Sequence, residues 1–556
     1  MSAITSLRAL LPAAADYRPM RRTWRGDLLA GITVGIVALP LALAFGVTSG
    51  AGAAAGLITA IVAGLVAAVF GGSNIQVSGP TGAMVVVLAP IVVSHGAGVV
   101  AVVSVAAGIV VLAAGILRIG RVVAFIPWPV IEGFTLGIAI IIFLQQVPAA
   151  IGSAAGTSTN ALISAAQSFA GADAATVGWA IGAVLVVAAI MMLAPRIHPK
   201  VPGSLIAIVL VTLIAMLAQL PLVTIGALPP GLPAPSTPVI DWGTASTLIG
   251  PILAVAALAS MESLLSARVG ASLADTGPYD PDRELVGQGL ASLASGFFGG
   301  MPATGAIART AVNVRSGGRT RLAAIVHAIV LLAVVYLAST VVAQIPLAAL
   351  SGVLMVTAVR MVSLPVVRSV VGSTRSDTVV FFVTAIITVS FDLIIAVAIG
   401  IAVAMVAAIR ALARSGGVHR EVIPGAAMPG DAHIAVFRLD GALFFGAAER
   451  MLDAVSKIAD VDVVILRLSQ LQLLDATGAR VITEMIQALE RRNITVLVKG
   501  IQPEHLRLAT RVGVIAALRH EQHLHTDLPA AVAHARSHVE RAGHAAPAGH
   551  AAPATD

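Results

Sequence analysis

The chain has no cysteine, few charged residues and few aromatic residues among its 556 positions. The absence of cysteine excludes disulfides and every zinc site built from thiolates. Charged residues make up only 11% of the chain, whereas hydrophobic residues make up 58%, with a mean hydropathy of +0.97. Most of the chain therefore belongs in a bilayer. Because we find no nucleotide-binding loop and no catalytic triad, we expect no enzyme and no cofactor.

Lys and Arg are clustered, so the net charge of +7 does not indicate nucleic-acid binding. No Lys or Arg lies between Arg25 and Arg118, or between Arg375 and Arg410. Cation clusters separated by long apolar stretches are typical of membrane proteins, whose cytoplasmic loops hold the positive charge. Successive clusters enclose an even number of apolar segments. We therefore expect both the N-terminal residues 1–25 and the region after Arg410 to be cytoplasmic.

The region 26–411 reads as an all-α, polytopic membrane domain of fourteen segments. The segments lie at about 28–46, 52–70, 81–95, 97–117, 129–148, 176–194, 202–220, 249–267, 285–298, 304–314, 322–342, 347–363, 377–391 and 394–410. Several are shorter than the roughly 20 residues that a full span needs. Seven segments per half invert the second half relative to the first. Such inverted repeats are typical of secondary transporters.

Two of the short segments, 81–95 and 304–314, begin with nearly the same sequence, called here the Pro-Thr-Gly sequences: Pro80-Thr-Gly-Ala83 and Pro302-Ala-Thr-Gly-Ala306. Proline is tolerated where a helix starts, because its missing N–H would have no partner there. The N–H groups that follow are unpaired and lie at the positive end of the helix dipole. Two such ends at matching places in the two halves indicate a transporter's binding site, here for an anion. We expect the substrate to contact Thr81, Gly82, Ala83, Thr304, Gly305 and Ala306.

Three further polar or helix-breaking features lie inside the segments. Glu262 is deep within a span, where an ionisable residue indicates function. It shares a helical face with Ser266, so the pair offers oxygen ligands for a cation, or Glu262 a site for a proton; structural bonding to backbone is the alternative. Arg309 would add positive potential beside the anion, or else form an ion pair with Glu262. Pro40 should kink or unwind the first segment, which could then line the site.

After Arg414 the sequence becomes that of a small soluble α/β domain, at 432–535, joined by a linker at 412–431. Alternation and apolar runs predict strands at 433–440, 461–468 and 494–498 and helices at 447–458, 475–489 and 503–511.

Two features of this soluble region bear on regulation and metal binding. Asp475 or Thr477 caps the helix at 475–489, or Thr477 is a phosphorylatable switch. We expect the tail at 536–556, which ends in a repeat containing histidine, to be disordered. Metal binding by its histidines is the alternative; our prediction is that the chain holds no metal.

These sequences resemble the sulfate permease (SulP) family. The resemblance rests on Asp27-Leu-Leu-Ala-Gly-Ile-Thr33, Ser78-Gly-Pro-Thr-Gly82, Glu284-Leu-Val-Gly-Gln-Gly289 and Ala308-Arg-Thr-Ala-Val-Asn-Val-Arg315. Gly441-Ala-Leu-Phe-Phe-Gly446 and Leu474-Asp-Ala-Thr-Gly478 resemble the family's C-terminal STAS domain. The resemblance implies two inverted seven-segment repeats, divided into a core and a gate. It also implies a homodimer in the inner membrane, with a cytoplasmic STAS domain.

The resemblance further implies secondary transport of a small anion (sulfate, bicarbonate or a C4-dicarboxylate) by an elevator-type motion. Glu262 and Ser266 match the positions at which an Asp and a Thr help to bind sodium in sodium-coupled bicarbonate members, whereas Glu is more typical of proton-coupled ones. Leu41 replaces a glutamine found in many sulfate-type members, which favours the bicarbonate and C4-dicarboxylate relatives. Thr477 matches the phosphorylated residue of anti-anti-sigma relatives. We predict proton coupling; the alternatives are sodium-coupled bicarbonate symport and an uncoupled exchanger or channel.

Overall fold

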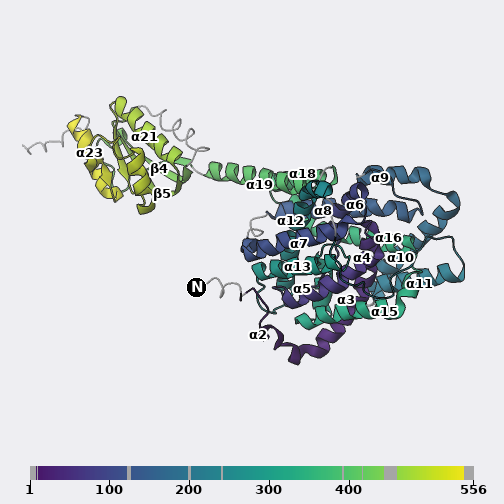
Figure 1. Ribbon diagram of the computed structural model, residues 1–556. Coiled ribbons are helices and arrows are strands. Elements are labelled where there is room, and N and C mark those ends of the chain that lie inside the picture. The colour runs from purple at the N-terminus through teal and green to yellow at the C-terminus, as the bar shows by residue number, and fades with distance from the viewer. Residues whose placement is uncertain are drawn as a thin grey trace, which may run out of the picture. The chain divides into compact units, whose positions relative to one another are not determined.

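The computed structural model describes residue 8 and residues 10–121, 127–158, 160–197, 202–238, 242–390, 393–415, 417–443 and 460–543. The chain divides into two compact units, Met1–Ile401 and Ala402–Asp556. The first unit is a helical bundle, and the second carries a five-stranded sheet (Figure 1). The predicted fold class, a helical membrane domain followed by a small α/β domain, is confirmed.

Every apolar segment of the sequence corresponds to helix in the bundle. The helices are α3 (Met20–Thr48), α4 (Ala53–Ile58), α5 (Gly64–Phe70), α6 (Gly82–His95), α7 (Val99–Ile116), α8 (Trp128–Ala150), α10 (Ala174–Ile197), α11 (Gly203–Leu217), α12 (Trp242–Leu273), α13 (Pro281–Phe297), α14 (Ile307–Arg315), α15 (Arg321–Val342), α16 (Leu347–Met361), α17 (Leu364–Val371), α18 (Arg375–Ser390) and α19 (Leu393–Ser415). A π-helix at Thr59–Ala63 joins α4 to α5. Of the described residues, eight helices are long and apolar enough to cross a membrane. The count of fourteen spans stays a prediction.

The helices of the bundle pack in two groups. In one group α7 packs on α13, α3 on α15, and α12 on α7, α13 and α14. In the other group α8 packs on α16 and α18, and α10 packs on α11 and α16. Each group combines helices from both halves of the membrane sequence. Helices α3 and α6 also pack on α16 and α8, and the division into a core and a gate stays a prediction.

Helices α7 and α13 approach closely because glycines face the partner's backbone. A Cβ atom added at Gly108 would lie 2.8 Å from the backbone nitrogen of Leu293, and one at Gly115 would lie 2.7 Å from that of Val286. The two glycines are two helical turns apart and so lie on one face. In lipid, where burying apolar side chains brings helices little gain, such small residues allow the close van der Waals packing that holds helices together.

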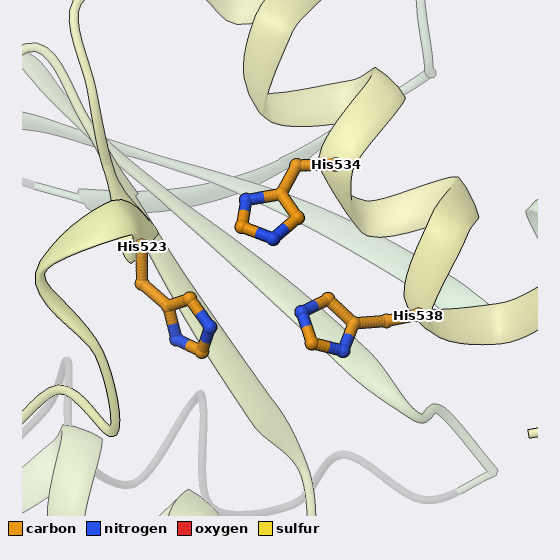
Figure 2. Close-up of side chains that lie close together, drawn as sticks. All are labelled: His523, His534 and His538. Atoms are coloured by element: carbon orange, nitrogen blue, oxygen red, sulfur yellow. The ribbon is translucent and has the colours of Figure 1, made fainter. Parts of the chain in front are cut away.

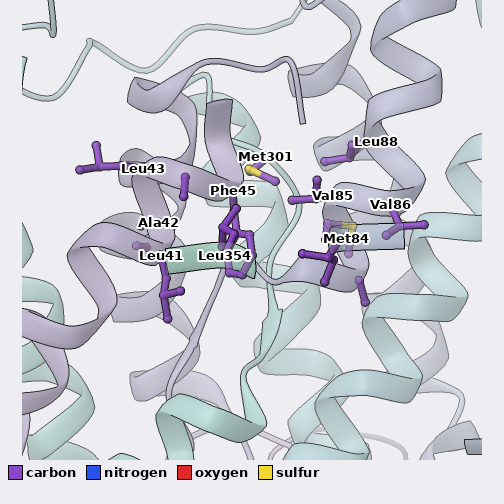
Figure 3. Close-up of a cluster of buried hydrophobic side chains, with 14 of the residues drawn as sticks. Leu41, Ala42, Leu43, Phe45, Met84, Val85, Val86, Leu88, Met301 and Leu354 are labelled. Atoms are coloured by element: carbon purple, nitrogen blue, oxygen red, sulfur yellow. The ribbon is translucent and has the colours of Figure 1, made fainter. Parts of the chain in front are cut away.

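The second half of α3 packs against α6 through buried apolar side chains, which Figure 3 shows. The cluster includes Leu41, Ala42, Leu43, Phe45, Met84, Val85, Val86, Leu88, Met301 and Leu354. Met301 lies in the loop ahead of α14, and its backbone N–H donates to the Thr59 hydroxyl at 2.8 Å. Thr59 belongs to the π-helix, a local irregularity that is frequent at functional sites. The π-helix thus helps to hold the loop that precedes the second short helix.

The second unit is built on a sheet of strand order β3-β4-β5-β6-β7. The strands are β3 (Gly417–Glu421), β4 (Ile434–Leu443), β5 (Val463–Leu474), β6 (Thr495–Lys499) and β7 (Leu524–His525). Strand β3 runs antiparallel to β4, and the other neighbours are parallel. Helices α21 (Ala476–Arg491) and α22 (Pro503–Val512) share one apolar cluster with the sheet, and α23 (Leu528–Arg541) shares another.

Several predicted boundaries in this part of the chain were wrong. The predicted linker 412–431 contains the end of α19 and strand β3, which pairs with β4 and so belongs to the sheet. The predicted disordered tail 536–556 begins inside α23, which continues to Arg541 because Ala535 and Val539 are buried against the sheet. The predicted helix at 447–458 lies outside the described residues.

Candidate functional site

The chain segments just before α6 and α14 pair with each other. They form two very short antiparallel strands, β1 (Ser78–Gly79) and β2 (Thr304–Gly305). The pairing continues for one more hydrogen bond, from the backbone N–H of Ala306 to the carbonyl of Val77 at 2.9 Å. The two Pro-Thr-Gly sequences therefore meet in space, as their matching positions in the two halves predicted.

Glu262 joins these two segments through hydroxyl groups. The hydroxyl of Thr81 donates to Oε2 of Glu262 at 2.7 Å, and the hydroxyl of Thr304 donates to the same oxygen at 2.8 Å. Both threonines are buried, whereas Glu262 is half-buried. Glu262 lies in α12, which packs on α6, β2 and α14. The structure thus brings together three of the predicted site residues, around one carboxylate.

The backbone N–H groups of Gly305 and Ala306 are engaged within the protein. That of Gly305 donates to the hydroxyl of Ser263 at 3.0 Å, and that of Ala306 donates to Val77. In this conformation these two N–H groups are therefore not free for a substrate, and contact of Gly305 and Ala306 with the substrate stays a prediction. Helix α14 begins only at Ile307, so the first-turn N–H groups without an intrahelical partner start there. In α6 the equivalent groups belong to Gly82 and Ala83, whose contact with the substrate stays a prediction.

Arg309 lies in the first turn of α14 and is 2% exposed. Its Nη2 donates to the carbonyl of Pro80, immediately ahead of α6. Its Nη1 is buried without a hydrogen-bond partner. Among the described residues no ion pair joins Arg309 to Glu262, so the alternative in which the two form a direct ion pair is wrong for this conformation. The guanidinium instead spans the starts of the two short helices and keeps a donor available.

Ser266 does not join Glu262 at a common site. Its hydroxyl lies 3.3 Å from that of Thr310, which accepts a hydrogen bond from the backbone N–H of Val77 at 3.1 Å. The sequence showed only that the two residues share a helical face. Ser266 lies one helical turn after Glu262. Its hydroxyl therefore lies beside Thr310 of α14, whereas the Glu262 carboxylate contacts Thr81 and Thr304. A shared cation site is thus not formed in this conformation.

Pro40 does not unwind its helix. Helix α3 is continuous from Met20 to Thr48, so the alternative in which Pro40 unwinds the segment is wrong, whereas a kink at Pro40 that lines the site stays a prediction. Phe45 of α3 lies close to the site: a Cβ atom added at Gly82 would be 3.4 Å from its ring. Aromatic contact with the start of α6 had no sequence signal, because Phe45 reads as one more apolar residue of the span.

A second buried carboxylate, Glu284 of α13, holds the loop that leads into β1. Its Oε2 accepts from the backbone N–H groups of Gly72 and Ser73, at 2.8 and 3.1 Å. Its Oε1 accepts from the side-chain amides of Gln76 and Gln288, both at 2.9 Å. The sequence motif contained Glu284 and Gln288, but their role was not predicted. Four donors on one carboxylate fix this loop and, through it, the start of α6.

Replacing Glu284 with glutamine is expected to destabilise the bundle and to abolish transport. A glutamine replaces one carboxylate oxygen with an NH₂ group. The two donors that now bind that oxygen would then face the N–H donors of the amide and lose their acceptor. Each unsatisfied buried donor costs about 1–3 kcal/mol. The measurement is the apparent melting temperature of the purified protein. Glu132→Gln is the matched control, because within the described part of the chain Glu132 accepts a hydrogen bond only from the nearby Trp128. Equal melting temperatures for the two variants would refute the prediction.

Asp27 of α3 plays a similar structural part at the start of α15. Its carboxylate accepts from the backbone N–H groups of Arg319 and Thr320, at 2.7 and 3.0 Å, and from the Thr320 hydroxyl at 2.6 Å. Thr320 is the N-cap of α15. A buried carboxylate at a helix N-terminus satisfies unpaired N–H groups and complements the dipole. Asp27, in the first of the sequence motifs, thus caps α15 rather than contacting the site.

In the second unit Asp475 caps α21, by accepting from the backbone N–H of Gly478 at 2.7 Å. Thr477 is exposed in the first turn of that helix. Capping by Asp475 accounts for its place in the motif, and Thr477 remains an accessible hydroxyl whose phosphorylation is a prediction only.

Comparison with known proteins agrees with this architecture. The model of the sulfate permease family matches residues 24–384, and the model of the STAS domain matches residues 426–527. The bicarbonate transporter BicA of Picosynechococcus is 30% identical over 522 residues, which cover 88% of this chain and 90% of BicA. YvdB of Bacillus subtilis, a candidate sulfate transporter, is 32% identical over 502 residues, covering 88% of this chain and 93% of YvdB.

Solved structures show the same fold. The transmembrane domain of a cyanobacterial bicarbonate transporter BicA matches with a TM-score of 0.62 at 33% identity, over 67% of this chain and 97% of that one. The anion transporter Slc26a9 of the mouse, in the inward-facing state, matches with a TM-score of 0.82 at 17% identity, over 96% and 95% of the two chains. At that identity the second match supports the fold alone. The chain belongs to the sulfate permease family of membrane transporters and carries a C-terminal STAS domain.

Proposed function

We propose that this protein is a secondary active transporter that carries a small anion together with a proton. The observation that supports this most directly is the pair of hydrogen bonds from Thr81 and Thr304 to one oxygen of Glu262. Each threonine hydroxyl has a single hydrogen to donate. While both hydrogens point at the ionised carboxylate, neither is available to an anion at the helix starts.

Protonation of Glu262 would change this balance in two ways. A neutral carboxyl group is a weaker hydrogen-bond acceptor than a carboxylate, so the two hydroxyls would be free to turn toward an anion. Protonation also removes a negative charge beside the site. Two unit charges about 4 Å apart interact by about 4 kcal/mol at an effective dielectric constant of about 20. Anion and proton would therefore bind together, which is the requirement for symport.

The proposed anion site lies where α6 and α14 begin. Its donors are the first-turn N–H groups of the two helices, the threonine hydroxyls and Nη1 of Arg309. Such a donor set suits a small oxyanion. Relatives named as bicarbonate and sulfate transporters support bicarbonate or sulfate as the substrate, and a C4-dicarboxylate would satisfy the same donors.

All of these donors lie on α6 and α14 or just ahead of them, and both helices pack on α12, the helix that carries Glu262. A site carried on a single group can move with it as a rigid body past the other group. We therefore propose an elevator-type motion of the group that contains Glu262. The distribution of Lys and Arg supports cytoplasmic placement of the N-terminus and the STAS domain, and the family resemblance supports a homodimer in the inner membrane.

The proposal is tested by uptake into proteoliposomes of labelled bicarbonate, sulfate and succinate. Each is measured with no gradient, with an inwardly directed proton gradient and with an inwardly directed sodium gradient. Accumulation of one anion driven by protons alone would support the proposal. Accumulation driven only by sodium, or equilibration without accumulation in every condition, would refute proton symport in favour of sodium symport or uncoupled exchange.

Ser266→Ala is expected to leave proton-driven uptake within about twofold of wild type. Its hydroxyl contacts Thr310 rather than Glu262, and removing one weak neutral hydrogen bond costs only about 0.5–1.5 kcal/mol. A sodium site would lose a ligand in this variant, so its sodium dependence would collapse. Initial rates under the two gradients separate these results, and a selective loss of sodium-driven uptake would contradict our assignment.

A further inference from the structure

Three histidine rings converge in the second unit, far along the chain from the transport site. His523 lies in a short 3-10 turn, Glu521–His523, just before β7, and His534 and His538 lie one turn apart on α23. Figure 2 shows the two rings of the helix facing the ring from the turn. The ring centroids of His523 lie 5.4 Å from those of both His534 and His538, which are themselves 4.9 Å apart.

The ring nitrogens of the three histidines lie close enough together to bind one metal ion. One ligand nitrogen from each of the three rings lies within 4.8 Å of the other two. Nδ1 of His523 and Nε2 of His538 are buried without a hydrogen-bond partner. An unpaired buried polar atom costs free energy, and a native structure normally satisfies it. A buried nitrogen without a partner in two of the three clustered rings is therefore unusual unless something binds there.

The third ring is oriented by a fourth histidine. Nδ1 of His534 lies 3.1 Å from Nε2 of His525 in β7. When His534 donates this hydrogen bond, its Nε2 keeps a free lone pair. Metal-binding histidines are commonly held in this way, through a hydrogen bond from the ring nitrogen that does not contact the metal.

The spacing of the three ligand nitrogens fits tetrahedral coordination of a metal ion after small side-chain rotations. Zinc binds histidine nitrogen at about 2.0–2.1 Å, which places ligand nitrogens of one tetrahedron about 3.3 Å apart. Three protein ligands would leave one position for water. Two histidines four residues apart on a helix, with a third from a neighbouring segment, are an arrangement that zinc and similar divalent ions favour.

We propose that His523, His534 and His538 form a binding site for Zn²⁺ or a divalent first-row ion of similar chemistry, with His525 as a positioning residue. The site would tie α23 to the turn before β7. Two of its ligands lie beyond residue 527, where the match to the STAS domain ends. The site is thus a feature of this chain's C-terminal helix, and bound metal would add to the apolar packing of Ala535 and Val539 that holds the helix on the sheet.

The test measures zinc bound to the full-length protein, purified in detergent without a polyhistidine tag. The protein is stripped with a chelator, exposed to zinc, desalted and measured by elemental analysis. We expect about one zinc per chain in the wild type and a loss of at least tenfold in His534→Gln/His538→Gln. Cobalt in place of zinc should give the visible absorption of a tetrahedral complex in the wild type only. His525→Ala should weaken binding about 10–100-fold.

The chain offers a matched control in the two histidines of its C-terminal repeat. His544→Ala/His550→Ala removes the same number of histidines and should retain full zinc binding. Circular dichroism checks that the His534→Gln/His538→Gln variant is folded. The proposal is overturned if the wild type binds no zinc, if the double glutamine variant binds as much as the wild type, or if binding is lost only with the tail histidines.

Discussion

Glu262→Gln is expected to abolish proton-driven accumulation of the anion while leaving exchange of the anion across the membrane. Glutamine is uncharged at every pH and resembles the protonated glutamate. Its carbonyl oxygen still accepts hydrogen bonds from Thr81 and Thr304, so the two short helices keep their connection. The variant should therefore bind the anion without having to take up a proton.

The size of the effect follows from the proton gradient. One pH unit corresponds to about 1.4 kcal/mol, so one proton carried with each monovalent anion supports about tenfold accumulation per pH unit. In the variant that ratio should fall to about one. The measurement is the steady-state anion ratio in proteoliposomes at imposed gradients of zero, one and two pH units.

A matched control separates coupling from general damage. Glu132→Gln makes the same chemical change on α8, outside the site, and should accumulate the anion as the wild type does. Counterflow of labelled against unlabelled anion, with no pH gradient, should remain within a few-fold of wild type in Glu262→Gln. Persistent proton-driven accumulation in that variant would remove Glu262 from the coupling role.

The fold was predictable because long apolar segments and their flanking cations carry a strong signal. Interior spans such as α7 and α15 match their predicted ranges within two residues at each end. The prediction was weaker where tertiary contacts decide the boundary. Helix α12 is longer than predicted, at Trp242–Leu273, and strand β3 lies in the predicted linker. The apolar periodicity and turn residues of α12 and β3 do not indicate which other elements these two segments pack on.

The candidate site was predictable in its composition and less so in its connections. The repeated Pro-Thr-Gly sequences located Thr81 and Thr304, and the rarity of charge in the spans located Glu262. Which hydroxyl meets which oxygen depends on the pairing of β1 with β2, two strands far too short to show any alternation. For the same reason Ser263 was missed: its polar contact, with Gly305, exists only because α12 passes that strand.

Glu284 and the histidine cluster were missed for different reasons. Glu284 belongs to a sequence motif, but its four donors come mostly from a loop that lies 208–212 positions away in the sequence. His534 and His538 have the spacing of two metal ligands on one helical face. The predicted boundary between the soluble domain and the disordered tail falls between them, which hid that spacing.

Arg309→Ala is expected to weaken anion binding by at least about 100-fold, corresponding to about 3 kcal/mol. The guanidinium is buried, donates to the carbonyl of Pro80 and keeps Nη1 without a partner. A charge-assisted hydrogen bond contributes about 1.5–3 kcal/mol, and removing the cation also lowers the positive potential at both helix starts. Concentration dependence of initial uptake rates, with and without a proton gradient, measures the effect.

The structural and binding roles of Arg309 are separated by two companion variants. Arg309→Lys retains the charge but not the planar fork, so it should recover part of the affinity if potential at the site matters. Arg315→Ala removes an exposed arginine near the end of the same helix and should transport normally. If Arg309→Ala binds the anion as well as Arg315→Ala does, Arg309 only ties α14 to the loop ahead of α6. If its affinity falls while its melting temperature stays near that of Arg315→Ala, the guanidinium takes part in holding the anion, and the two short helices then act with a buried cation rather than through their dipoles alone.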